Sequence, residues 1–417
     1  MAIVVANMIG TGVFTSLGFQ LNDLNNPYAI LLLWGIGGVL ALSGAFSYAE
    51  IGTHIQRSGG EYAFLTAMFN PLIGYLAGWV SITVGFAAPV ALAAIACIEY
   101  FPYLQINPKG VGILLVGIIT MIHTKNLRIS SLFQNVSTVF KIILVVALIG
   151  LGLILRGTSD DFSQEKYFFT EVMSPAFAVA LIYVSYSYSG WNAAAYITEE
   201  FENPRRSLPR ALIVGTLIVT VLYVLLQYVF LKHVPIAELR GQLDVGRIAV
   251  HKMIGADIGK YFGLAISLLL VSGVSAMVWV GPRVTASIGK EHALWKYFSK
   301  EEQNVPARAL WLQFALTSIL LITGTFEQIL IYCGVLLTLS SMMTVAGGII
   351  LRVQNEKGSS DAYKSPFSPL FHIIFIILAL WMVIYAFVDK PFESMAGLGN
   401  LILGGITFWV SNRTKNK

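Results

Sequence analysis

The chain has 417 residues, of which 56% are hydrophobic and 12% are charged, and its formal net charge is +5. Soluble domains carry about 25% charged residues, so this composition excludes a water-soluble globular protein. The apolar runs are continuous rather than alternating, which argues against a transmembrane β-barrel. The positive charge comes largely from loops between apolar segments, so we expect no nucleic-acid partner.

Apolar segments of about 20 residues recur along the chain, the length that a helix needs to cross ~30 Å of hydrocarbon. They predict an all-α, multi-pass integral membrane protein with twelve transmembrane helices in a single transport domain, 1–417. The predicted spans are 1–21, 28–52, 72–97, 109–124, 130–155, 171–198, 208–231, 258–288, 307–324, 326–351, 368–388 and 394–411. The segments around 232–257 and 289–306 are expected to form short surface helices.

The distribution of Lys and Arg orients these spans. With the N-terminus inside, most of the 27 basic residues fall in cytoplasmic segments. These are Arg57, Lys125, Arg128, Arg205, Arg206, Arg210, Arg283, Lys290, Lys296, Lys300, Arg308, Arg352, Lys357, Lys364, Arg413, Lys415 and Lys417. The positive-inside rule therefore predicts a protein of the cell (cytoplasmic) membrane with both termini in the cytoplasm.

The first span begins unusually close to the start of the sequence. Met1 lies only nine residues before Gly10, so its α-amino charge would lie within the membrane, which is energetically costly. We expect the natural chain to have further residues before Met1.

Two predicted spans are weak near their centres. The first contains Gly10-Thr11-Gly12, and the sixth contains the run YSYSG at 186–190. Small residues often serve helix packing in membranes, which is the alternative explanation for each cluster alone. Irregular backbone survives in the bilayer only where it faces protein or a polar cavity, because each unpaired group costs several kcal/mol. Two breaks at corresponding places therefore predict a central cavity.

The positions of the breaks predict an internal repeat. Each interrupted span opens a set of five, and the two sets start on opposite sides of the membrane. This arrangement is typical of inverted-repeat transporters with a site at mid-membrane. We expect a first repeat over 1–156, a second over 171–352, and two peripheral helices over 368–411.

A broken helix also predicts the type of ligand. Its free N–H groups attract an anion and its free C=O groups attract a cation. An amino acid carries both charges on its α-carbon. We expect the amides of Thr11 and Gly12, helped by the Thr11 hydroxyl, to hold the carboxylate, and carbonyls near Ala6, Asn7 and Tyr186 to hold the ammonium.

Several motifs resemble those of a known transporter family. The run NMIGTGVF at 7–14 resembles the first-helix motif of the amino acid–polyamine–organocation (APC) superfamily. The run YSGWN at 188–192, with TEEFENPRRSLPRA at 198–211, is similar to its L-type amino-acid transporter branch. The runs YAE at 48–50 and RSGGEY at 57–62 resemble the family's second helix and re-entrant loop.

The resemblance implies a LeuT-type fold, with ten helices in two inverted repeats plus two peripheral ones. It implies a substrate site between helices 1, 3, 6 and 8, a gating role for Tyr186 and a place for Asn192 near the substrate side chain. Together, the argument from the breaks and the resemblance give these candidate substrate-binding residues: Ile9, Gly10, Thr11, Gly12, Tyr186, Ser187, Ser189, Gly190 and Asn192.

Lys141 lies in the middle of the fifth predicted span. Thirteen residues of helix, roughly 20 Å, separate it from Arg128, so its side chain cannot reach the interface. The resemblance implies that such a lysine occupies the place where sodium-coupled relatives bind Na⁺, near hydroxyls such as Ser272 or Ser275. This predicts sodium independence. A fixed tether and a proton-linked role both remain open.

No Asp or Glu lies near the middle of a predicted span, so we expect neutral L-amino acids as substrates. Alternating access by exchange is the expected mechanism, with proton symport as the alternative. An intramembrane enzyme would need a cluster of catalytic side chains, and a channel a ring of pore-lining polar groups; neither is evident. We expect no cofactor or metal site, and monomer and homodimer remain open.

Overall fold

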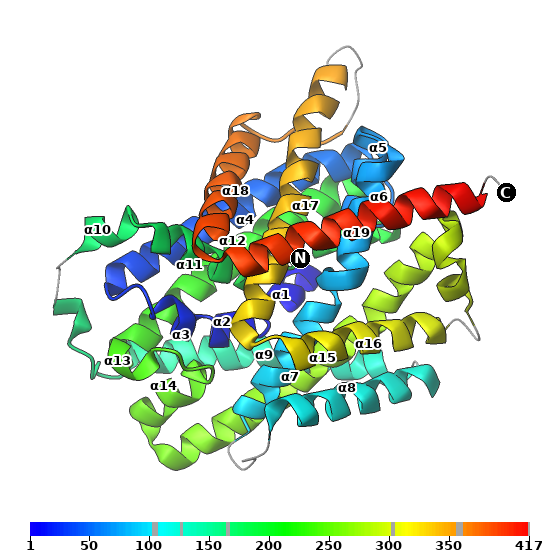
Figure 1. The fold of residues 1–417 in the computed structure, drawn as a ribbon. Coiled ribbons are helices and arrows are strands. Elements are labelled where there is room, and N and C mark those ends of the chain that lie inside the picture. Colours follow the sequence, from blue (N-terminus) through cyan, green and yellow to red (C-terminus); the bar gives the residue numbers. More distant parts are fainter. Residues whose placement is uncertain (102–106, 126–127, 164–166, 302–304, 356–361, 416–417) are drawn as a thin grey trace.

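A computed structural model describes residues 1–101, 107–125, 128–163, 167–301, 305–355 and 362–415. These ranges are mainly helical (Figure 1). The α-helices are α1 Ala2–Met8, α2 Gly12–Thr15, α3 Leu17–Gln20, α4 Pro27–His54, α5 Glu61–Met68, α6 Pro71–Val80, α7 Ala87–Glu99, α8 Pro108–Lys125, α9 Arg128–Ile154, α10 Phe168–Val172, α11 Pro175–Ser187, α12 Pro204–His233, α13 Ile236–Leu239, α14 Val245–Ile254, α15 Ala256–Glu291, α16 Ala307–Thr323, α17 Phe326–Asn355, α18 Leu370–Asp389 and α19 Pro391–Lys415. One π-helical segment, η1 Ser81–Gly85, and three 3-10 segments, η2 Asp161–Ser163, η3 Ala193–Glu200 and η4 Ala293–Ser299, complete them.

Eight helical segments in the described ranges are long and apolar enough to cross a bilayer. They are Pro27–His54, Pro71–Glu99, Val136–Ile154, Pro204–His233, Ala256–Glu291, Phe326–Gln354, Leu370–Asp389 and Pro391–Arg413. Three shorter apolar helices, Pro108–Thr124, Pro175–Ser187 and Ala307–Thr323, fall within the fourth, sixth and ninth predicted spans. The first predicted span consists of three short helices, α1 to α3. The prediction of an all-α, multi-pass membrane protein is confirmed.

Four apolar helices begin at a polar residue that caps the first turn and is followed by proline. These pairs are Asn26-Pro27 at α4, Asn70-Pro71 at α6, Asn107-Pro108 at α8 and Ser174-Pro175 at α11. The polar side chain accepts a hydrogen bond from a free amide of the first turn. Proline suits the next position because it lacks the N–H that would be unpaired there. The predicted start of the sixth span at 171 is therefore wrong, because Ser174 accepts from the Phe177 amide and starts a new helix after α10.

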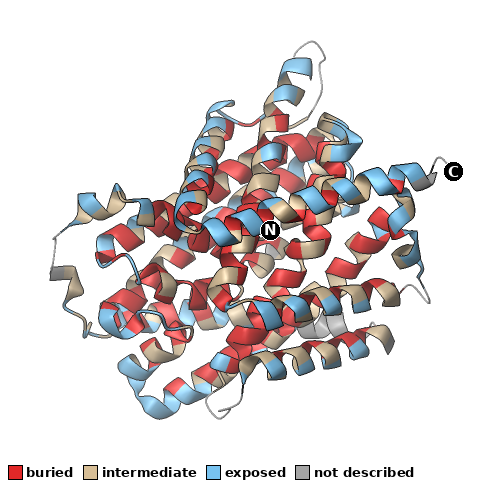
Figure 2. Ribbon diagram, viewed as in Figure 1, coloured by how far each residue is buried: buried red, intermediate tan, exposed pale blue. Residues whose placement is uncertain are grey.

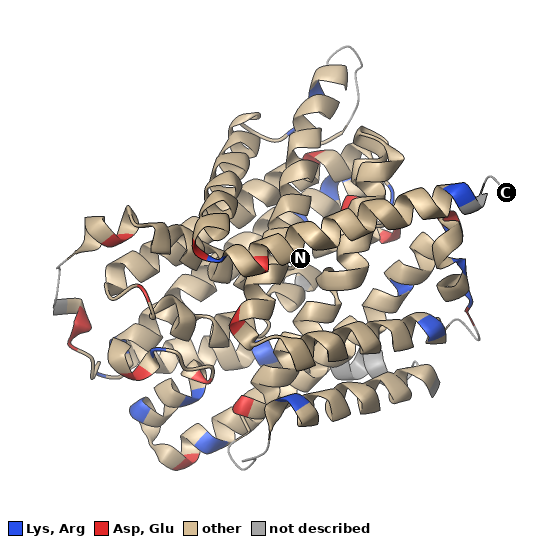
Figure 3. Ribbon diagram, in the orientation of Figure 1, with Lys and Arg blue, Asp and Glu red and all other residues tan. Residues whose placement is uncertain are grey.

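The broken N-terminal segment lies inside the bundle. Helix α1 lies near the middle of the view in Figure 1 and contacts α12 and η3. Helices α18 and α19 pack against α17, and also against α4 and α6, respectively. Buried residues concentrate toward the centre (Figure 2), and charged residues are sparse along the ribbon (Figure 3). Exposed apolar side chains such as Ile143 and Ile402 lie on outer helices, as expected for a surface that faces lipid.

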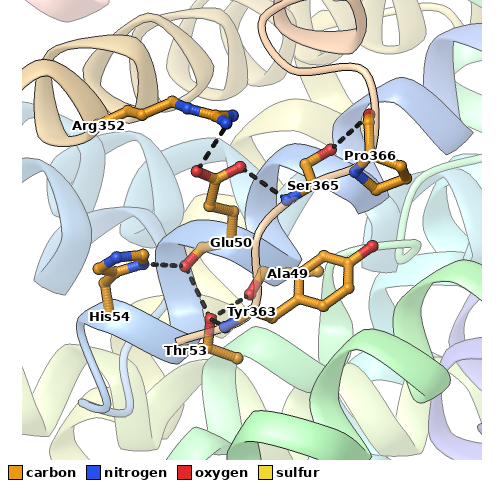
Figure 4. Close-up of polar contacts among 8 residues, drawn as sticks. All are labelled: Ala49, Glu50, Thr53, His54, Arg352, Tyr363, Ser365 and Pro366. Atoms are coloured by element: carbon orange, nitrogen blue, oxygen red, sulfur yellow. Dashed lines mark hydrogen bonds and ion pairs between the residues drawn. The ribbon is translucent and has the colours of Figure 1, made fainter. Parts of the chain in front are cut away.

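A polar cluster ties the segment before α18 to α4 and α17 (Figure 4). The buried Glu50 carboxylate accepts the Ser365 amide at 3.0 Å and lies 3.5 Å from the Arg352 guanidinium. One helical turn after Glu50, the Thr53 hydroxyl accepts a hydrogen bond from the Tyr363 amide at 3.1 Å. Burial and the Glu50 charge both raise the pKa of the Tyr363 phenol, which therefore stays neutral. The cluster fixes this connection against the end of α4.

Lys232 caps the end of α9 from the neighbouring helix α12. Its ammonium donates to the carbonyls of Gly152, Leu153 and Leu155 at 3.0, 3.1 and 2.8 Å. Carbonyls at a helix end have no partner within the helix, so we expect Lys232→Met to lower the free energy of unfolding by about 1–2 kcal/mol. Thermal unfolding in detergent measures this effect.

Lys252→Met is the matched control, since the ion pair of Lys252 with Glu238 lies at the surface, where such pairs contribute little. Equal losses of thermal stability in the two variants would contradict a capping role for Lys232.

Candidate functional site

The first predicted span is interrupted. Helix α1 ends at Met8 and α2 begins at Gly12, with a bend between them. Within the described part of the chain, the amides of Gly10, Thr11 and Gly12 donate to no group. Free amides of this kind, as at the start of a helix, are groups that can hold an anion.

Free carbonyls accompany these amides. No donor among the described residues reaches the carbonyls of Ala6 and Asn7, which would bond to residues 10 and 11 if the helix continued. By contrast, the Met8 carbonyl accepts from the Tyr223 hydroxyl, and the Val13 carbonyl accepts from Gln227 Nε2 at 3.0 Å. Side chains of α12 therefore hold the broken segment in place while leaving part of it unpaired.

The second break follows α11. That helix ends at Ser187, and residues 188–192 form turns before the 3-10 segment η3. Gly190 has φ +95°, a conformation that favours glycine. The Tyr186 carbonyl itself accepts a hydrogen bond from the Ser189 amide at 2.9 Å. The carbonyls on either side of it, of Ser185 and Ser187, have no donor in the described ranges.

The two breaks lie against each other. The hydroxyls of Ser16 and Ser187 are 2.8 Å apart, and those of Thr11 and Tyr186 are 3.4 Å apart. A Cβ placed on Gly12 would lie 2.6 Å from Ser187 Cα. A Cβ on Gly190 would lie 2.9 Å from the main-chain carbon of Asn7. Two interrupted helices, far apart in sequence, therefore touch through their backbones.

A cavity of about 770 Å³ surrounds this junction. All nine candidate substrate-binding residues line it: Ile9, Gly10, Thr11, Gly12, Tyr186, Ser187, Ser189, Gly190 and Asn192. The volume suits a small ligand. Two of the hydroxyls are already engaged, because Ser187 donates to the Tyr183 carbonyl at 2.9 Å and Tyr186 lies beside Thr11.

Lys141 and Ser272 also line the cavity, whereas Ser275 lies apart from it, with its hydroxyl 2.9 Å from His123 Nε2. Lys141 makes no hydrogen bond or ion pair with any residue whose position is described. The structure thus places both Lys141 and Ser272 at the cavity wall. Among the described residues, neither the two serines nor the carbonyls of the first span accept a hydrogen bond from the Lys141 ammonium.

Sequence reasoning missed two carboxylates at the cavity. The exposed Glu200 and the buried Glu61, which is 4% exposed, both line it, so the expectation that no carboxylate reaches the site is wrong. Glu61 Oε1 accepts from the Tyr48 hydroxyl at 2.8 Å and from Asn192 Nδ2 at 2.7 Å, and Glu61 Oε2 accepts from the Tyr196 hydroxyl. Glu61 begins α5, outside the apolar runs, and only the tertiary fold returns it to the bundle. Its place in the RSGGEY motif was the one available signal.

The neighbouring residue extends this connection. The Tyr62 hydroxyl donates to Glu291 at the end of α15 and lies 3.3 Å from His292 Nε2. Burial, followed by the contact with Glu291, raises the pKa of Tyr62, so its hydroxyl stays protonated as a donor. Helix α5 therefore joins the second break, through Glu61, to the end of α15, through Tyr62.

A π-helical segment also shapes the cavity and was missed. Within the third predicted span, η1 interrupts the α-helix, and Ser81, Gly85 and Phe86 at or beside it line the cavity. Such bulges are frequent at functional sites, but no composition signal identifies them.

Comparisons with known proteins identify the family of this chain. The family model described as amino acid permease matches residues 1–409. The b(0,+)-type amino acid transporter 1 of Mus musculus is 27% identical over 420 residues, covering 98% of this chain and 85% of that protein. The large neutral amino acids transporter small subunit 2 of Homo sapiens is 25% identical over 423 residues, covering 96% of this chain and 77% of that protein.

Proposed function

Because this chain belongs to the amino acid permease family, we propose that its cavity carries neutral L-amino acids across the cell membrane by alternating access. The observation that carries this proposal is the junction of two broken helices, with free amides at residues 10–12 and free carbonyls nearby. Amides attract the α-carboxylate and carbonyls the α-ammonium, so a zwitterion satisfies groups that are otherwise unpaired. Ala6, Asn7, Ser185 and Ser187 supply the carbonyls in this proposal.

The membrane topology proposed is that of a LeuT-type transporter with twelve transmembrane helices and cytoplasmic termini. Eight long apolar segments, three shorter ones and the broken α1–α3 segment support it. The first repeat would cover 1–156 and the second 171–352, with peripheral helices over 368–411. Each repeat would then open with an interrupted helix. Tyr186, 5% exposed and beside Thr11, would close the site.

Neutral substrates remain the proposal despite Glu61. Its carboxylate already accepts three hydrogen bonds, from Tyr48, Asn192 and Tyr196, so it does not need a cationic side chain as a partner. The large neutral amino acids transporter among the relatives also supports neutral substrates.

Sodium independence and exchange are the remaining parts of the proposal. Lys141 and Ser272 both line the cavity, and a fixed ammonium there would repel a sodium ion. Proton symport is the second candidate mechanism, since a lysine in an apolar site can release its proton.

Uptake into proteoliposomes tests the mechanism with three arms: a Na⁺ gradient, a proton gradient, and preloaded unlabelled amino acid. We expect stimulation by preloading alone. Stimulation by the proton gradient would identify symport, and stimulation by Na⁺ would overturn the role assigned to Lys141. Absence of amino-acid uptake in every arm would overturn the substrate class.

A further inference from the structure

A buried carboxylate at the cavity wall fixes the orientation of a side-chain amide. Glu61 Oε1 lies 2.7 Å from Asn192 Nδ2 and 2.8 Å from the Tyr48 hydroxyl, and Tyr196 donates to the second oxygen. An ionised carboxylate only accepts hydrogen bonds, so the amide of Asn192 must turn its NH₂ group toward Glu61. With donors on both oxygens, Glu61 is itself held in one position.

The orientation leaves the other end of the amide available. Asn192 lines the cavity, and its Oδ1 accepts no hydrogen bond from any residue that the structure describes. A carbonyl oxygen at a cavity wall is a hydrogen-bond acceptor that a ligand can use. Had the NH₂ group faced the cavity instead, the site would have offered a donor.

Asn192 is also well placed to meet a substrate side chain. It lies two residues beyond Gly190, where an added Cβ would lie 2.9 Å from the Asn7 carbonyl carbon at the junction of the breaks. If the breaks hold the α-carboxylate and α-ammonium, as under the proposed function, the side chain of the amino acid extends from the junction along the cavity wall that Asn192 helps to form.

We propose that Glu61 is a positioning residue which fixes Asn192 with its carbonyl oxygen toward the cavity, so that the transporter prefers neutral amino acids whose side chain donates a hydrogen bond. This inference rests on the proposed function and specifies its substrate class. Hydroxyl amino acids satisfy the acceptor, whereas their apolar isosteres offer it no hydrogen bond.

Isosteric substrate pairs test the preference. In proteoliposomes, we expect the wild-type protein to favour threonine over valine, and serine over 2-aminobutyrate, by about tenfold in the ratio of maximal rate to KM. Glu61→Gln frees the Asn192 amide to turn either way, so we expect KM for threonine to rise, KM for valine to stay unchanged and the preference to fall. The control is Glu199→Gln. Glu199 is an exposed carboxylate of η3 that does not line the cavity, so this variant should retain the wild-type preference.

A second variant keeps the test decisive if Glu61→Gln fails to fold. Asn192→Leu removes the acceptor and should transport valine at least as well as threonine. Equal wild-type transport of threonine and valine, or an unchanged preference in either variant, overturns this inference alone. Failure of the wild-type protein to transport any of the four amino acids overturns the proposed function instead.

Discussion

Gly12→Ala is expected to reduce amino-acid uptake by about tenfold or more, because overpacking of a closed junction costs about 1–3 kcal/mol. A methyl group at this position would lie 2.6 Å from Ser187 Cα and 2.7 Å from its hydroxyl oxygen. Since Cα belongs to the main chain, no side-chain rotation relieves the contact. The two breaks must separate, and the free amide of Gly12 moves with them.

Initial uptake rates in proteoliposomes measure this effect, with gel filtration in detergent to verify that the variant is folded. Gly35→Ala is the matched control on α4, since no atom beyond its chain neighbours and the local helix backbone would lie within 4 Å of the added methyl group. A folded Gly12→Ala protein with wild-type uptake would show that close contact between the breaks is not needed for transport.

Lys141→Ala is expected to abolish uptake or lower it strongly. The substitution removes a positive charge from the cavity wall in a region of low dielectric, where charges interact strongly with ligands and helix ends. The measurement is the initial uptake rate at fixed substrate concentration, with and without Na⁺ outside. The wild-type rate should not respond to Na⁺.

Lys260→Ala serves as the control, because Lys260 lies at the surface in an exposed pair with Asp257. We expect this control to retain wild-type uptake. Normal transport kinetics in a folded Lys141→Ala protein would mean that the ammonium is dispensable.

The segments that cross the membrane could be predicted from the sequence because lipid imposes a simple rule. Each span must be apolar over its whole length and satisfy its own backbone, so the length and composition of α4, α12 or α18 suffice to identify it. The interruptions at residues 9–11 and 188–192 were predictable for the related reason that glycine and serine in mid-span weaken a helix. The start of the sixth span was missed because α10 precedes it without a clear change in hydropathy.

The cavity wall was less predictable. Glu61 follows two glycines with positive φ, Gly59 at 120° and Gly60 at 57°, and this turn redirects the chain into α5. Whether such a segment returns to the bundle depends on partners distant in sequence, here Asn192 and Tyr196. The π-helical turn at Ser81–Gly85 likewise depends on packing between helices rather than on local preference.

The sequence by itself determined the membrane class, the long apolar helices and the two weak points, because hydrophobicity and backbone pairing are properties of single segments. Only the tertiary structure decided that residues 10–12 contact 186–187 at the wall of one cavity, which carbonyls remain free there, and that the Glu61 carboxylate holds Asn192. Hydrogen bonds act over a few ångströms, so their partners are known only once the helices are placed in space.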